Sequence, residues 1–117
     1  MTLTELDKLE LYLIEAGYIP RVLTFFETGH KFFERIDTDE DYFNRHQIIV
    51  YDENGKRLWD AICQIGSYGY ERGLLEIYGN IVNEKEDGDS VVGWLTADEV
   101  IERLEKRGRI NENTRDH

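Results

Sequence analysis

The strongest local constraint on the fold is a β-hairpin signal in the middle of the chain. The apolar run Ile48–Tyr51 leads into an acidic turn that contains Asn54 and Gly55, and a second apolar run follows. Asn-Gly between two such runs is typical of a two-residue hairpin loop, because both residues tolerate left-handed backbone. A three-residue loop with a bulge at Gly55 is the alternative, and it shifts the pairing by one residue. The two-residue loop predicts the cross-strand pairs Val50–Trp59, Ile48–Ala61 and His46–Cys63.

The N-terminal segment is predicted to be an amphipathic helix. Thr2 and Glu5 have the spacing of a capping box, which starts the helix near residue 3. Gly17 and Pro20 favour an end near Ala16. Apolar residues recur at helical spacing and predict one wide buried face, made of Leu3, Leu6, Leu9, Tyr12, Leu13, Ile14 and Ala16.

The remaining segments are predicted mainly as strands. Aromatic and branched clusters in residues 21–36 favour two strands with a turn between them, although a helix over 21–26 is the alternative, because runs this short do not reveal their period. A glycine-rich loop at 66–73 precedes strands at 74–82 and 91–95, with a polar turn at 83–89 between these strands.

The last element is predicted to be a helix with a strong start signal. Thr96 and Glu99 form a second capping box, and Gly108 is expected to end the helix. The whole pattern predicts an α+β fold, with a sheet of five or six mostly antiparallel strands and both helices packed on one face. We expect a single domain over residues 1–108 and a polar C-terminal tail over 109–117.

Charge narrows the function classes. The 117 residues carry 25 acids against 14 bases, a formal net charge of −11. Such a chain repels nucleic acids and anionic membrane surfaces and is attracted to basic partners. Cys63 is the single cysteine and cannot form an internal disulfide, which favours a reducing compartment, and we expect the cytoplasm. No apolar run approaches the length that a membrane span needs.

No catalytic or metal signature is found. Three aspartates at 37, 39 and 41 resemble the start of a calcium loop, but Tyr42 and Ile48 stand where such a loop needs Gly and Glu. His46 and Cys63 are only two potential metal ligands. We therefore expect a protein that is not an enzyme and has no cofactor. A small hydrolase or metal-dependent enzyme is a further hypothesis, and it requires a pocket that gathers His46, Cys63, Asp60 or Glu76.

Two short acidic segments and one glycine-rich loop are the candidate binding sites. Concentrated anions beside exposed aromatic side chains suit a basic protein groove, because charge speeds association and apolar contacts hold the complex. Tyrosines between glycines offer contact area at low ordering cost. Solubility alone is the simpler explanation of the acids. The predicted partner-binding residues are Asp37, Asp39, Glu40, Asp41, Tyr68, Tyr70, Glu84, Glu86, Asp87 and Asp89.

Five segments together resemble a known group of sequences. They are His46–Asp52, Trp59–Cys63, Gly66–Tyr70, Gly73–Ile77 and Gly93–Thr96. Over roughly half of the chain, this pattern is similar to small acidic uncharacterised proteins carried by phages and conjugative elements of Gram-positive bacteria. The resemblance implies no activity and no functional residue. It implies a context, because mobile elements often carry small acidic proteins that block host nucleic-acid enzymes.

The leading hypothesis is a cytoplasmic binding protein without enzymatic activity. Its partner would be a basic, nucleic-acid-binding protein, and the chain would inhibit it as a DNA mimic of the anti-restriction or anti-CRISPR type. The chain itself is expected to bind neither nucleic acid nor membrane. The second hypothesis is a homodimeric accessory protein that pairs an exposed sheet edge, or the region of Trp59 and Trp94, with a second copy.

Overall fold

A computed structural model describes residues 3–24, 45–64 and 66–115, with side chains described as far as Arg107. The sheet has five strands in the order β1-β2-β3-β4-β5, and each strand is antiparallel to the next. The elements are α1 (Glu5–Glu15), β1 (Ile19–Thr24), β2 (Arg45–Tyr51), β3 (Arg57–Ile62), the 3₁₀ turn η1 (Tyr70–Arg72), β4 (Leu75–Gly79), α4 (Glu84–Asp87), β5 (Val91–Leu95) and α5 (Ala97–Arg115).

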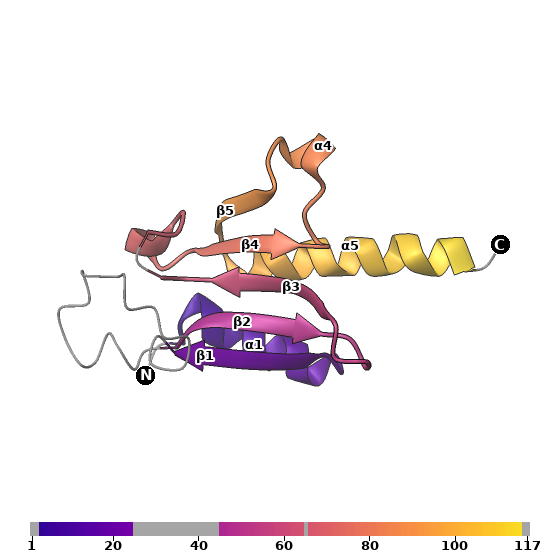
Figure 1. The fold of residues 1–117 in the computed structure, drawn as a ribbon, viewed down its shortest axis with the longest axis horizontal. Helices are drawn as coiled ribbons and strands as arrows, with labels where there is room; N and C mark the ends of the chain where they lie inside the picture. Colours follow the sequence, from indigo (N-terminus) through magenta and orange to yellow (C-terminus); the bar gives the residue numbers. More distant parts are fainter. Residues whose placement is uncertain (1–2, 25–44, 65, 116–117) are drawn as a thin grey trace.

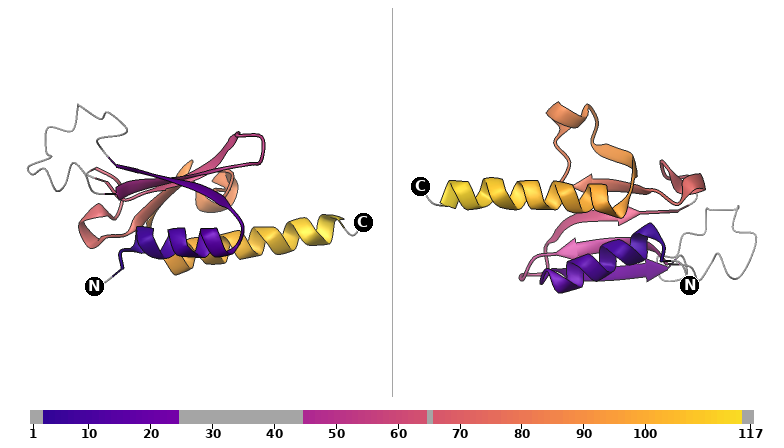
Figure 2. Two further views of the ribbon diagram at one scale, coloured as in Figure 1. Left: turned by 90° about the horizontal axis from the view of Figure 1, so that it is seen from below. Right: turned by 180° about the vertical axis from the view of Figure 1, so that it is seen from behind.

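Both long helices cover the same face of the sheet. In Figure 2, α1 and α5 lie side by side beneath the strands, and α4 projects beyond the β5 edge (Figure 1). The arrangement confirms the predicted α+β class and the packing of both helices on one face. Short connections such as the β2–β3 hairpin favour this arrangement, because they join consecutive strands as antiparallel neighbours.

The core lies between the helices and the inner face of the sheet. Alternate residues of β2, β3 and β4 point into it, as period-two strands require. Trp59 is the largest buried side chain, with 2% of its surface exposed. The core residues are Leu6, Leu9, Leu13, Ile48, Val50, Trp59, Ala61, Leu75, Ile77, Ile81, Leu95, Ala97, Val100 and Leu104.

The central hairpin has the predicted register but a different loop. Val50 pairs with Trp59 and Ile48 with Ala61, as a two-residue loop predicts. The tip is nevertheless a three-residue loop, because the Gly55 amide donates to the carbonyl of Asp52 at 3.0 Å and Gly55 has φ +81°. A register shift between Val50 and Tyr51 compensates for the extra residue. The prediction of a two-residue Asn54-Gly55 loop is therefore wrong at the tip and right in the strands.

The first helix uses a different cap from the predicted one. Thr4 is the N-cap, and its hydroxyl and the Asp7 carboxylate bond to each other's backbone amides. Glu5 is free of that role and accepts the Ala97 amide at the start of α5, at 3.2 Å. The helix ends at the predicted place, with Ala16 as C-cap and Gly17 at φ +86°.

The predicted buried face of α1 is too wide. Its buried residues are Leu6, Leu9 and Leu13, whereas Leu3 and Ile14 are 45% and 56% exposed. Leu11, which also belongs to the exposed side, is 51% exposed. Only one stripe of a helix can contact a sheet, so Leu11 and Ile14 face solvent, while Tyr12 at the margin of the stripe is partly buried against the core.

Several boundaries differ from the sequence-based expectation. The strand prediction for 21–26 is confirmed as far as Thr24, and residues 25–36 lie outside the described part of the chain. The strand predicted over 74–82 is limited to β4, Leu75–Gly79. The expected end of the last helix at Gly108 is wrong, because α5 continues to Arg115. A glycine within a helix costs only about 1 kcal/mol, so it does not by itself end one.

The second predicted capping box is present at the start of α5. The Thr96 hydroxyl accepts the Glu99 amide at 3.2 Å, and the Glu99 carboxylate accepts the Thr96 amide at 3.0 Å. Within the described residues, none of the helices is both long and apolar enough to cross a bilayer.

Candidate functional site

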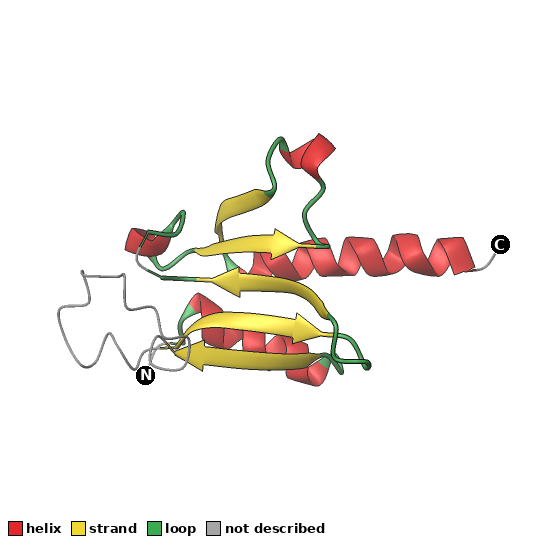
Figure 3. Cartoon of the chain, viewed as in Figure 1, coloured by secondary structure: helices red, strands yellow, loops and turns green. Residues whose placement is uncertain are grey.

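The glycine-rich loop that precedes β4 is held firmly against the end of the sheet. The Tyr68 amide donates to the Glu76 carboxylate at 3.0 Å, and the Tyr68 carbonyl accepts the Trp94 amide at 3.3 Å. Gly69 allows this approach, because a Cβ there would lie 2.8 Å from Leu74 Cβ and 3.2 Å from Trp94 Cα. Through Tyr68, the loop therefore bonds to both β4 and β5. Figure 3 shows the loop, with its short helical turn in red, beside the start of β4.

A β-bulge in β5 lies at this junction. Ile77 pairs with Val92 and Leu75 with Leu95, so Gly93 and Trp94 together stand opposite a single residue of β4. Trp94 has φ +62° and is the one residue other than glycine with positive φ in the described part of the chain. Left-handed backbone is costly for a residue with a bulky side chain, and such strain often accompanies functional sites. The bulge changes the direction of the Trp94 side chain.

Tyr68 and Trp94 form an exposed aromatic pair, which we call the aromatic edge. They are 54% and 52% exposed. Gly93 lies against the base of the Tyr68 side chain, and any Cβ at this position would overlap it. The two rings thus come from adjoining backbone positions, one in the loop and one in β5. Large exposed aromatic side chains at a sheet edge are a common feature of protein-binding surfaces.

Acids stand at both ends of β5. Asp89 precedes the strand and Asp98 follows it, both are exposed, and neither forms an ion pair within the described residues. Glu71, in η1 next to the loop, is exposed as well. The outer edge of β5 has no neighbouring strand in the described sheet. The aromatic edge therefore lies on an open strand with negative charge at each end.

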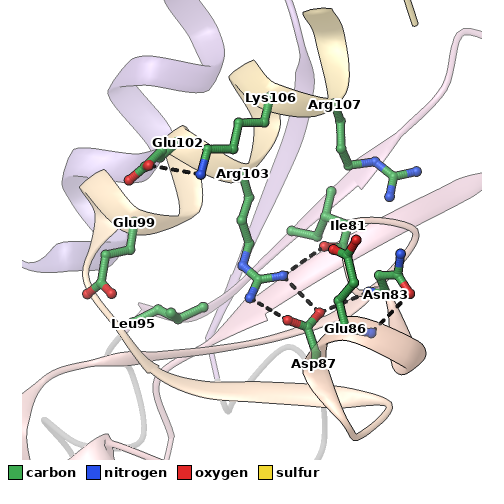
Figure 4. Close-up of a pocket in the computed structure, with 10 residues that line it drawn as sticks. All are labelled: Ile81, Asn83, Glu86, Asp87, Leu95, Glu99, Glu102, Arg103, Lys106 and Arg107. Carbon is green, nitrogen blue, oxygen red and sulfur yellow. Dashed lines mark hydrogen bonds and ion pairs between the residues drawn. The ribbon is translucent and has the colours of Figure 1, made fainter. Parts of the chain in front are cut away.

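A groove lies between α4 and α5. This groove has a volume of about 450 Å³, with Ile81 and Leu95 at its floor and charged side chains along its walls (Figure 4). Arg103 crosses it and forms two bonds to the Asp87 carboxylate, at 2.8 and 3.0 Å, and a third to the Ile81 carbonyl at 3.3 Å. The Arg103 guanidinium lowers the pKa of Asp87 by hydrogen bonding. The groove thus contains the clamp that holds α4 to α5.

Because of the clamp, the acids of the 84–89 segment are not all free to contact a partner. Asp87 is paired with Arg103, and Lys106 and Arg107 also line the groove beside Glu86. Glu84, Glu86 and Asp89 remain exposed. Arg103 of α5 therefore neutralises one acid of this segment, and Asp87 is a structural residue rather than a free contact.

Of the other predicted binding residues, Asp37, Asp39, Glu40 and Asp41 lie outside the described residues. Tyr68 is exposed as a binding residue should be. Tyr70 is half-buried in η1, and its amide donates to Ser67 at 3.3 Å.

The four residues of the enzyme hypothesis do not converge. His46 is buried on the face that the helices cover, and Cys63 packs against the core. Burial raises the pKa of the Cys63 thiol, which disfavours the reactive thiolate. Asp60 and Glu76 alternate with core residues and therefore point to the opposite face.

Asp60 is the unusual carboxylate of that opposite face. It is 7% exposed and accepts from Gln47 at 2.8 Å and from Arg57 at 2.9 Å. Its Oδ1 has no hydrogen-bond partner among the described residues. Burial raises the pKa of Asp60, and the bonds from Gln47 and Arg57 partly oppose this. Within the described ranges, no group of three potential metal ligands is found at this position or elsewhere.

One feature of the sequence indicates the aromatic edge, although the sequence-based prediction of the site does not include it. Gly93 interrupts the β5 pattern directly before Trp94, and a glycine inside a strand often marks a bulge. The sequence-based hypothesis instead grouped Trp94 with Trp59 as a surface, and this grouping is wrong because Trp59 is buried in the core.

Comparison of the chain with family models, with curated proteins and with solved structures gives no match. The resemblance to phage and conjugative-element proteins therefore stays a prediction.

Proposed function

We propose that the chain is a binding protein without enzymatic activity, and that it holds a basic segment of a partner protein along the β5 edge. The observation that carries this proposal is Trp94, which is half-exposed at positive φ in a bulge of the last strand. The fold stores backbone strain at this residue without burying its side chain. Contact with another molecule is a physical reason to keep it.

The chemistry of the edge favours a basic, extended partner segment. An open strand edge can pair with the backbone of such a segment, and side chains at its two ends then select the partner. Asp89 and Asp98 attract lysine and arginine, while Trp94 offers its ring face to a guanidinium. The net charge of −11 adds long-range attraction.

The partner class we propose is a basic nucleic-acid-binding protein. Basic arms that bind phosphate are typical of such proteins, and the same arms suit an acidic strand edge. When the acids of this chain occupy the arm, the arm no longer contacts nucleic acid. The chain then acts as an inhibitor that competes with nucleic acid, and Asp87 takes no part because Arg103 neutralises it.

An NMR titration with an arginine-rich peptide tests the position of the site. We expect amide shifts concentrated in Val91–Leu95 and at Tyr68, and weaker binding as salt rises. The double variant Tyr68→Ala/Trp94→Ala should lose at least about tenfold in affinity, because exposed aromatic anchors carry much of such binding energy. Shifts spread evenly over all acidic segments would contradict the proposal.

A charge reversal tests the electrostatics against a matched control. Glu71→Lys, beside the aromatic edge, should weaken binding of the peptide. Glu53→Lys changes the net charge equally at the distant β2–β3 hairpin tip and should have a much smaller effect. A pull-down from host lysate at graded salt then identifies the natural partner. Nucleic acid should displace the chain from it, and a partner that binds both together would refute competition.

A further inference from the structure

A second apolar surface lies at the opposite side of the molecule, on α1. Eight large hydrophobic side chains are exposed among the described residues, and five of them belong to α1 or its immediate flanks. We call this set the α1 outer patch. It consists of Leu3, Leu11, Ile14, Tyr18 and Ile19, which are between 37% and 56% exposed.

The patch has the form of a helix-pairing seam. Leu11 and Ile14 are three residues apart, so their side chains are neighbours on the helix surface. They lie apart from the stripe of Leu6, Leu9 and Leu13 that contacts the sheet. Two adjacent apolar positions with this spacing are the a and d positions of a coiled-coil layer. A second helix with the same spacing would cover them.

The charges that flank the seam favour a second copy of this chain. Lys8 and Glu15 are seven residues apart, so they occupy the same side of the seam. In an antiparallel pair of α1 helices, Leu11 of one copy lies beside Ile14 of the other. The same arrangement brings Lys8 of each copy opposite Glu15 of the other. Lys8 pairs with Glu5 of its own helix at 3.0 Å, but its side chain is half-exposed and also faces Glu15 of the second copy in this arrangement, which gives two complementary pairs.

The other side of the seam is compatible with the same arrangement. Glu10 is already paired with Arg45, and in the antiparallel pair it faces Gly17 of the second copy. A parallel pair would instead bring Glu10 of each copy opposite Glu15 of the other. Like charges at these positions are unfavourable, so the sequence selects the antiparallel direction.

We infer that the α1 outer patch is a homodimer interface in which two α1 helices pack antiparallel around a two-fold axis. The interface is isologous, as closed dimers require. It lies on the β1 side of the sheet, so both β5 edges stay accessible. A single helix pair buries less than a standard interface, so we expect a weak dimer that forms only at high protein concentration.

Sedimentation of the full chain at about 5 µM and about 500 µM tests the dimer. The mass should rise from one chain toward two with concentration. Leu11→Asp/Ile14→Asp should stay at the mass of one chain at both concentrations. Its circular dichroism should match the parent chain, because both side chains are exposed. A parent chain that stays at the mass of one chain, or a folded double variant that still dimerises, would overturn the inference.

A charge exchange tests the direction of the helices. Lys8→Glu should weaken dimerisation about tenfold, since two attractive pairs become repulsive. The substitution also removes the Lys8–Glu5 pair within α1, so its circular dichroism is compared with that of the parent chain and should match it. Lys56→Glu changes the net charge equally at the exposed hairpin tip and should weaken it much less. Adding Glu15→Lys to Lys8→Glu restores complementary pairs and should return the dissociation constant to within about threefold. Failure of this rescue would overturn the antiparallel arrangement. Binding of the arginine-rich peptide at the β5 edge is measured in a separate experiment, so that failure of the dimer is distinguished from failure of the proposed function.

Discussion

Trp94 shows how a single backbone angle can conflict with its side chain. Left-handed backbone costs an L-residue roughly 1–2 kcal/mol relative to ordinary conformations, whereas glycine adopts it freely. Trp94 has φ +62° because the β5 bulge places one extra residue opposite β4. The strain is a property of the position, so it persists when the ring is removed.

Two substitutions of Trp94 separate the effect of backbone strain on stability from the effect of the aromatic ring. Both Trp94→Gly and Trp94→Ala remove the aromatic side chain. We expect the glycine variant to have a free energy of unfolding about 1 kcal/mol higher than the alanine variant, because only glycine relieves the strain. Urea unfolding measures both. Val92 is the control, since it has no positive φ, and there alanine should be the more stable of the two.

Asp60 gives a pH dependence that can be isolated by one substitution. Burial raises its pKa in the folded state above the unfolded value. The folded state therefore binds this proton more tightly, and its contribution favours folding at low pH. This contribution declines as pH rises from the unfolded pKa through the folded pKa, and it is constant above the folded value.

The expected result concerns the difference between the parent chain and Asp60→Asn. All other carboxylates are common to both proteins, so their contributions to the pH dependence of stability cancel. The stability of the parent relative to the variant should fall as pH rises above the ordinary carboxyl pKa and through the raised folded value. Urea unfolding at several pH values in this interval measures it. A relative stability that rises with pH would show that the bonds from Arg57 and Gln47 outweigh burial.

At the scale of elements, the clamp between Asp87 and Arg103 holds α4 to α5 in place of packed apolar side chains. No residue of α4 is buried, and its attachment to α5 relies on the paired bonds of the guanidinium. Two-point pairs of this kind are stronger than single exposed ion pairs. The clamp therefore sets the position of the β4–β5 connection.

Asp87→Asn should lower the free energy of unfolding by about 1 kcal/mol at neutral pH. The pKa of Asp87 is lowered in the folded state, so its contribution is complete above the ordinary carboxyl pKa and is lost as pH falls through the folded value. Parent and variant should thus converge in acid. Glu102→Gln breaks the exposed Glu102–Lys106 pair and should cost less than about 0.5 kcal/mol. Equal effects of the two substitutions would contradict the clamp.

Local sequence signals predict an element well where a few neighbouring residues meet a single requirement of the backbone, such as a helix cap or a strand register. The box of Thr96 and Glu99 starts α5 as expected, and the alternation around Val50 and Trp59 fixes the hairpin register. The two-residue loop was wrong because a bulge can absorb an extra residue at the tip without changing the strands. The cap of α1 was wrong because Thr2 and Thr4 offer similar boxes, and packing against α5 decides between them.

The candidate site was less predictable than the fold. The exposure of Tyr68 is predictable from composition, because glycines beside a tyrosine indicate an exposed loop. The pairing of Asp87 with Arg103 depends on how α4 folds onto α5, sixteen residues apart in sequence, and no local pattern encodes it. The exposed side of α1 was missed for a similar reason. Helical spacing indicates which residues share a face, but not how wide a stripe the sheet covers.

At the scale of the whole molecule, two electrostatic effects oppose each other. The described residues form six ion pairs, and in most of them one partner is half-exposed. Exposed pairs contribute a few tenths of a kcal/mol each. The net charge of −11 acts against them, because repulsion among the excess carboxylates disfavours the compact state. Salt screens both effects, so its net influence reveals which is larger.

We expect repulsion to dominate. Raising NaCl from about 20 mM to about 500 mM shortens the screening length to a few ångströms and should raise the free energy of unfolding by about 1 kcal/mol. Urea is the suitable denaturant because it is uncharged. A variant with Glu53→Gln and Glu86→Gln removes two exposed, unpaired carboxylates and should gain less from the same salt. If salt instead lowers the urea midpoint, the ion pairs outweigh the repulsion, and long-range attraction to a basic partner becomes a weaker basis for the proposed binding.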